Sequence, residues 1–323
     1  MHMGKMVARS IAFMEPYRRY LKAFCCMSVS PGRDLPDGNG VSMRSIKTRG
    51  VGDELKSLVG GSPHHNIHAL NQLDDELKER VYTLLVPDKV FEEFNIDRLT
   101  FLNEDDERVL NLISPRQAGF AIIEIREHPG DRDCIFFLEI ADTPFFKVEI
   151  TFLIINDPRS PRYNTDIDDS GRRTKFGTAR RNKSEELKAM RAGLAPGQVR
   201  QGLRLLKEFM PRVLQFISAM GHDMLVAEPL AYHDAIIFEH HGFNYVRGKK
   251  KMEEINNGFA LGGALYEQLD EGNPFRPPGA EKTVRGRSWA IHDGILGEPW
   301  KNIEMYRPVA KPASVSTFPG WTY

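Results

Sequence analysis

The fold is decided by residues 118–157, which read AGFAIIEIREHPGDRDCIFFLEIADTPFFKVEITFLIIND. Three segments rich in Ile, Phe and Val, with polar residues interleaved, are separated by the turn-forming sequences HPGD (128–131) and DTP (142–144). Apolar and polar residues that alternate between turn sequences predict β-strands joined as hairpins. We therefore expect three antiparallel strands over 118–128, 132–142 and 145–157.

The next part of the chain predicts an insertion and then helices alternating with strands. Residues 158–197 are polar, basic and rich in turn formers, with one short helix expected at 183–192. A long helix is predicted within 196–221, PGQVRQGLRLLKEFMPRVLQFISAMG, beginning near residue 199, with Pro211 expected to kink or divide it. A strand (222–229), a helix (231–243) and a strand (244–248) follow. This order predicts a mixed α/β fold with a mainly antiparallel sheet flanked by helices.

The flanking regions are expected to be less regular. Residues 1–60 form a basic, poorly ordered extension and linker, for which a transit peptide is one alternative. The α/β domain then spans 61–255, with helices expected at 70–85 and 90–96. Residues 256–323, with a helix-like patch at 258–269, form a C-terminal arm that contains all three tryptophans, Trp289, Trp300 and Trp321. We expect these to pin the arm to the body or to a dimer mate, although covering a substrate cleft is also open.

The composition excludes several classes of protein. Lys and Arg number 44 and Asp and Glu number 44, so a surface that coats nucleic acid is not expected. Three cysteines cannot build a disulfide framework, and no apolar run is long enough to cross a membrane. We expect a soluble, cytoplasmic protein. The histidines at positions 64, 65 and 68 leave a metal-dependent enzyme as a minor alternative, but no metal is expected because solvated loop histidines explain them better.

Residues 236–252, IIFEHHGFNYVRGKKKM, with the order of elements before them, resemble the GNAT superfamily of N-acetyltransferases. The resemblance covers about residues 118–250, and its late aromatic-Tyr-Glu-x-x-Gly-Phe signature is matched by Ile237, Phe238, Glu239, Gly242 and Phe243. It implies an acyl-CoA N-acyltransferase fold in which the fourth strand diverges from the fifth. Acetyl-CoA or another acyl-CoA would lie in that gap, beside Ile154 of the 145–157 strand, as co-substrate.

The resemblance also places the pyrophosphate at the loop that enters the 196–221 helix. Gly202 lies there, with Gln198, Arg200 and Arg204 as the nearest candidate ligands and Arg180 and Arg181 as second choices. A helix N-terminus and a glycine suit a phosphate, and residues 172–212 carry 12 Lys and Arg against 3 Asp and Glu. The loop departs from the family pattern, because Arg204 stands where a small residue is expected.

Transfer to an amine requires a base, because an ammonium group has no lone pair for attack. Glu149 on the fourth strand is the first candidate, Glu228 at the end of the next strand is the second, and His233 is also plausible. The tyrosine that serves as acid in many members is replaced by Phe238, which leaves Tyr232 or Tyr245.

Two functions from different classes follow. The first is an acyl-CoA-dependent N-acyltransferase in which an amine attacks the thioester directly. The second is a non-catalytic binding or structural module of the same fold. A small amine, an aminoglycoside, a peptide terminus and a lysine side chain all remain open as the acceptor.

Overall fold

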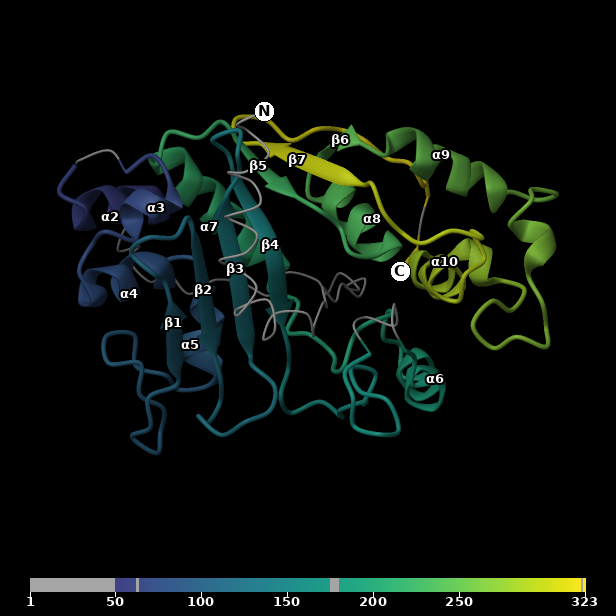
Figure 1. The fold of residues 1–323 in the computed structure, drawn as a ribbon, viewed down its shortest axis with the longest axis horizontal. Helices are drawn as coiled ribbons and strands as arrows, with labels where there is room; N and C mark the ends of the chain where they lie inside the picture. Colours follow the sequence, from purple (N-terminus) through teal and green to yellow (C-terminus); the bar gives the residue numbers. More distant parts are fainter. Residues whose placement is uncertain (1–49, 62–63, 175–179, 321) are drawn as a thin grey trace, which may run out of the picture.

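A seven-stranded sheet forms the centre of the protein (Figure 1). The computed structural model describes residues 50–61, 64–174, 180–320 and 322–323. Within them the strand order is β1-β2-β3-β4-β5-β7-β6, and only β4 and β5 are parallel. The predicted mixed α/β class with a mainly antiparallel sheet is confirmed.

The predicted meander is also confirmed. It consists of β2 (Phe120–Ile125), β3 (Phe136–Asp142) and β4 (Val148–Ile155), each antiparallel to its neighbour. A further strand, β1 (Leu110–Ile113), pairs with β2 at the edge of the sheet and was not predicted. Its four residues are too few to show a periodicity in the sequence.

The strands β4 and β5 (Met224–Ala227) run side by side over a short distance only. Val148–Ile150 pair with Leu225–Ala227, after which residues 151–155 of β4 continue without β5. Figure 1 shows the end of β5 turning away from the lower part of β4. This divergence is the main geometric feature of the sheet.

The C-terminal segment contributes a strand to the sheet. β7 (Glu304–Pro308) lies between β5 and β6 (Asn244–Arg247) and is antiparallel to both. The expected packing of this segment on the body of its own chain therefore includes insertion into the sheet. The tryptophan at position 321 lies outside the described residues.

Helices cover the sheet and share one main core with it. The N-terminal part supplies α2 (Val51–Leu58), α3 (Ile67–Leu70), α4 (Asp75–Thr83) and α5 (Asp88–Glu93). The insertion supplies α6 (Lys183–Arg191), as predicted, and α7 (Leu206–Ala219) follows it. The rest comprises α8 (Tyr232–His240), α9 (Lys249–Gly258), α10 (Val284–His292) and short 3-10 turns at Tyr266–Gln268 and Ala280–Lys282.

Several predicted helix boundaries are wrong. The single helix expected at 70–85 is divided between α3 and α4, because the buried Asn71 side chain donates to the Ala118 and Phe120 carbonyls and Asp74 caps α4. The helix expected to begin near residue 199 begins at Leu206, and Pro211 lies inside it without dividing it. The patch at 258–269 holds one 3-10 turn, while the longer α9 precedes it.

Most of the N-terminal extension, residues 1–49, lies outside the described residues, although Val51–Leu58 form the regular helix α2. No helix in the described ranges combines the length and apolar sequence required to span a bilayer.

Candidate active site

Two predicted carboxylates lie together where β4 and β5 part. Glu149 is in register with Val226, and Glu228 follows two residues later along the same strand direction. Alternate residues of a strand share a face. The intervening positions on both strands, Val148, Ile150, Leu225 and Ala227, belong to the main core. Glu149 and Glu228 therefore share the opposite face of the sheet.

The surroundings of Glu149 change its acidity. Partial burial, followed by the negative charges of Glu228, Glu304 and Glu139, raises the pKa of Glu149 to about 7. Glu304 is paired with Arg247 at 3.2 Å, whereas neither Glu149 nor Glu228 has an ion pair within the described residues. A carboxylate with this pKa can accept a proton near neutral pH.

The loop before α7 offers unpaired donors. In the described structure, the backbone N–H groups of residues 202–207 have no hydrogen-bond acceptor. The N-terminus of a helix carries a partial positive charge, so such groups suit an anion. Arg204 is exposed and has a φ of +60°, a conformation that favours glycine, at the position where the resemblance expects a small residue.

Two candidate phosphate ligands have other partners. The Gln198 side chain is buried and its oxygen accepts the Ala195 N–H at 2.6 Å. The Arg200 Nε lies 2.8 Å from an Asp133 oxygen, and its guanidinium also donates to the Pro158 and Ser160 carbonyls. The Gln198 side chain thus makes a local contact within the loop, whereas Arg200 ties the loop to Asp133. In this conformation neither side chain is free for the phosphate that we predicted them to bind.

Asp133 binds both Arg162 of the insertion and Arg200 just after it. Burial alone would raise the pKa of Asp133, but hydrogen bonds from Arg200 and Arg162 lower it. The carboxylate therefore stays ionised and ties the start of β3 to both arginines. The insertion is a packed part of the domain at this point.

The other three predicted cofactor ligands also have partners in the fold: Arg180 and Arg181 form ion pairs, and Ile154 is packed. Arg181 is paired with Glu186 and with Asp293 of the C-terminal segment, both at 2.6 Å. Arg180 lies 3.6 Å from Asp168. The Ile154 side chain is buried with its neighbours on the sheet face opposite the main core, so only its backbone could border the gap.

Tyr232 lies beside a cavity of about 670 Å³ that Glu228 also lines. Its hydroxyl is 3.5 Å from an Arg287 nitrogen, and burial raises the pKa of Tyr232 to about 12. Its ring makes an edge contact with Trp300, at 6.1 Å between centroids. Of the predicted site residues, the structure thus brings Glu149, Glu228 and Tyr232 into one neighbourhood.

The other acid and base candidates are buried in the fold. The Tyr245 hydroxyl donates to Glu239, and Phe238 stacks on Phe243 at 4.7 Å. His233 is fully buried, its Nδ1 lies 2.9 Å from the Ser288 Oγ, and burial lowers its pKa. Glu239, Phe238 and His233 of α8 thus bind residues of β6, of the turn after α8 and of α10.

One of the three histidines at positions 64, 65 and 68 contacts a distant part of the fold. His65 Nδ1 contacts the Met220 carbonyl at 3.1 Å. Within the described residues, the single cluster with metal-ligand spacing is Glu127, His128 and Asp131 on the β2–β3 turn, and none of these was a candidate ligand.

Sequence reasoning missed the C-terminal residues at this site. Trp300 and Ile291 line the cavity, and Glu304 adds charge beside Glu149. The only signal in the sequence was the presence of tryptophans in an irregular segment.

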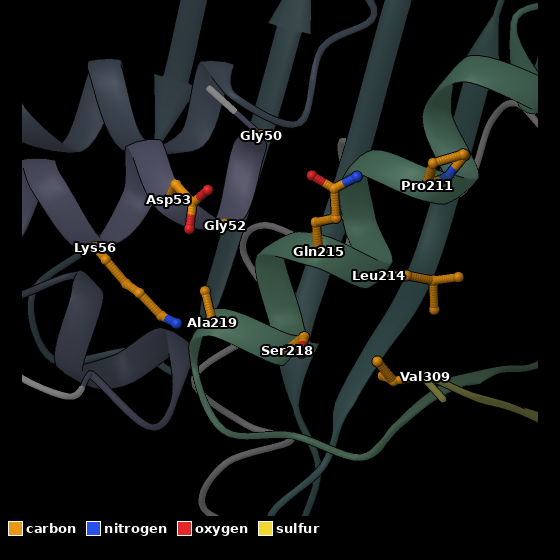
Figure 2. A pocket seen from close by; sticks show the side chains of 10 residues that line it. All are labelled: Gly50, Gly52, Asp53, Lys56, Pro211, Leu214, Gln215, Ser218, Ala219 and Val309. Carbon is orange, nitrogen blue, oxygen red and sulfur yellow. The ribbon is translucent and has the colours of Figure 1, made fainter. Parts of the chain in front are cut away.

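A second cavity, of about 470 Å³, lies between α2 and α7 (Figure 2). Figure 2 shows Asp53 and Lys56 of α2 opposite Gln215 and Ser218 of α7. These α7 residues lie outside the buried side of that helix. The cavity contains none of the predicted site residues and is separate from the diverging strands.

Comparison of the chain with family models, curated proteins and solved structures finds no match.

Proposed function

We propose that this protein is an acyl-CoA-dependent N-acyltransferase in which an amine attacks the thioester directly. The observation that carries the proposal is Glu149, with a pKa of about 7, beside Glu228 at the divergence of β4 and β5. A base that titrates near the working pH is what an amine acceptor requires.

The free backbone donors support the acyl-CoA part of the proposal. The N–H groups of residues 202–207 would bind the pyrophosphate, and the exposed Arg204 and Lys207 would add positive charge. Gln198 and Arg200 are left out of this role because their side chains are bonded to Ala195 and to Asp133. The thioester would then reach the gap beside residues 151–155 of β4.

The proposed reaction uses Glu149 as the base. Glu149 takes a proton from the bound ammonium, and the neutral nitrogen attacks the thioester carbonyl carbon. The new C–N bond forms and the C–S bond breaks. The nitrogen then gives up its second proton, and the CoA thiolate takes up this proton and leaves as the thiol. Tyr232 lines the same cavity as Glu228, so its hydroxyl is placed to hydrogen-bond the departing thiolate. Because burial raises the pKa of this hydroxyl to about 12, above that of a thiol, the net proton comes from the attacking nitrogen.

One observation favours the second candidate function, a non-catalytic module that still binds CoA. Phe238 occupies the position of the family's tyrosine and is buried against Phe243, so it has no proton to donate. The two candidates differ in turnover and agree on binding.

Two measurements test the proposal. Thermal unfolding with 1 mM CoA should raise Tm, because a ligand at 100 times its Kd adds about 2.7 kcal/mol to the free energy of unfolding. Free thiol release from acetyl-CoA in the presence of an amine panel measures transfer. Binding without amine-dependent thiol release would support the non-catalytic module, and the absence of both would overturn either function.

A matched pair of variants locates the phosphate site. Arg204→Glu should abolish most of the CoA-induced rise in Tm, since it places a negative charge at the free N–H groups. Lys250→Glu makes the same charge change on the exposed start of α9 and should leave the rise intact. Equal effects of the two variants would argue against a phosphate site before α7.

A further inference from the structure

The cavity beside Glu228 has apolar walls from two distant parts of the chain. Pro229 and Leu230 come from the connection between β5 and α8, while Ile291, Trp300 and Ile303 come from the C-terminal segment. Leu230 keeps 43% of its surface exposed at this wall, although it is a large apolar residue. The cavity therefore offers apolar surface that a ligand would bury.

Trp300 is a fixed part of this wall. Its indole N–H donates to the Pro229 carbonyl at 2.9 Å, so the ring cannot rotate without losing that hydrogen bond. Its edge contact with Tyr232 holds the ring from a second side. A rigid aromatic wall costs little entropy when a ligand packs on it.

The charges around the cavity are unequally distributed. Glu228 has no ion pair within the described residues and lies next to Glu149, which is also unpaired. Glu298 is paired with Lys251 at 2.9 Å, so this pair adds no net charge. Lys301 is exposed and lies near Glu298. Uncompensated negative charge is thus found at the Glu228 end.

Building on the proposed function, we propose that the acceptor is a primary amine with an apolar body about as large as an aromatic ring. The ammonium group lies against Glu228 and next to Glu149, and the body packs between Trp300 and Leu230. The volume of about 670 Å³ is within the range of small-molecule sites. The C-terminal segment thus selects the acceptor, while β4 supplies the base.

Three small probes separate the charge from the apolar body. Isothermal titration of the full chain, without acyl-CoA, would use 3-phenylpropylamine, propylamine and 3-phenylpropanol. We expect 3-phenylpropylamine to bind at least about tenfold more tightly than either other compound, because only it uses both ends of the cavity. Equal affinity of the three compounds, or no binding of 3-phenylpropylamine, would overturn the inference.

Substitutions at Trp300 and Glu228 test whether these two residues contact the amine. Trp300→Ala should weaken 3-phenylpropylamine binding about tenfold, and Trp300→Phe, which keeps a ring and guards against a folding defect, should retain most of it. Glu228→Gln should weaken binding about fivefold, whereas the same change at the exposed Glu254 of α9, which does not line the cavity, should not weaken it. Unchanged affinity in Trp300→Ala and Glu228→Gln would place the amine elsewhere.

The CoA experiments keep the two proposals distinguishable. CoA-dependent stabilisation and thiol release without a preference for 3-phenylpropylamine would overturn this inference alone. Tight, Trp300-dependent amine binding without any response to CoA would overturn the transferase and leave an amine-binding site.

Discussion

Two buried or half-buried glutamates in this protein have opposite surroundings. Glu239, near the end of α8, accepts hydrogen bonds from the Tyr245 hydroxyl and from the backbone and hydroxyl of Thr317. Glu149, at the parting of β4 and β5, faces other carboxylates and has no ion pair within the described residues. Burial raises the pKa of both groups, but only Glu239 is compensated by donors. The contrast separates a carboxylate that stabilises the fold from one that is available for chemistry.

The largest expected effect is on turnover. Glu149→Gln should lower kcat/KM by about 100-fold, the lower end of the usual contribution of a general base. The wild-type rate should rise with pH through about 7 as Glu149 loses its proton, and the variant should lose this rise. Rates of thiol release between pH 5.5 and 8.5 measure both, with the exposed Glu253→Gln as control. A variant with the wild-type pH profile would remove Glu149 from the mechanism.

Glu239 should behave in the opposite way. Glu239→Ala should lower the free energy of unfolding by about 3 kcal/mol, because it leaves the Tyr245 and Thr317 donors buried without an acceptor. The thiol-release rate per folded molecule should be unchanged. Urea unfolding measures the loss, and Glu239→Gln, which keeps an acceptor oxygen, should lose less than half as much. Equal losses in the two variants would show that the hydrogen bonds contribute little.

Gly242, just after the end of α8, packs closely against the C-terminal segment at Pro312. Gly242 has a φ of +80°, and an added Cβ would lie 2.5 Å from the Pro312 Cβ. Gly242→Ala should therefore cost about 2 kcal/mol of stability, part from the backbone and part from the clash. Gly262→Ala is the matched control, because its φ is +75° with nothing within 4 Å of the added atom. The same cost at both positions in urea unfolding would exclude a contribution from Pro312.

The smallest effect is a gain in stability at Glu149. The pKa of Glu149 is about 7 in the folded state and 4.5 ordinarily, so the folded state binds more protons between these pH values. The contribution of Glu149 to the free energy of unfolding therefore falls as the pH rises from 4.5 to about 7. Glu149→Gln should therefore be more stable than the wild type above pH 7, by about 1 kcal/mol once solvent screening of a half-buried group is included. The gain should vanish below pH 4.5. Thermal unfolding at pH 4 and pH 8 checks the sign, and a loss at pH 8 would contradict the assigned pKa.

The parts of the fold that could be predicted depend on local pattern. β2, β3 and β4 alternate apolar and polar residues between turn sequences, so they were found. β7 reads EMYRP and ends in proline, and its identity as a strand depends on pairing with β5, about 80 residues earlier in the chain. The break between α3 and α4 likewise depends on Asn71 bonding to carbonyls near β2.

The same limit applies to the site. Glu149 and Glu228 could be chosen because each lies on a predicted strand, but their proximity requires the parallel register of β4 and β5. Arg200 looked free in the sequence because its partner, Asp133, is 67 residues away. Local sequence identifies the type of a side chain, and its partners come from the tertiary fold.

The position of β7 has a consequence for synthesis of the protein on the ribosome. Until residues 304–308 leave the exit tunnel, β5 and β6 each present an unpaired edge, and Trp300 is not yet in place. A nascent chain that stalls before this point exposes two hydrogen-bonding edges and lacks one side of the cavity. The pairing of β5 and β6 through β7 and the placement of Trp300 against Pro229 thus depend on the same late-synthesised segment, residues 300–308.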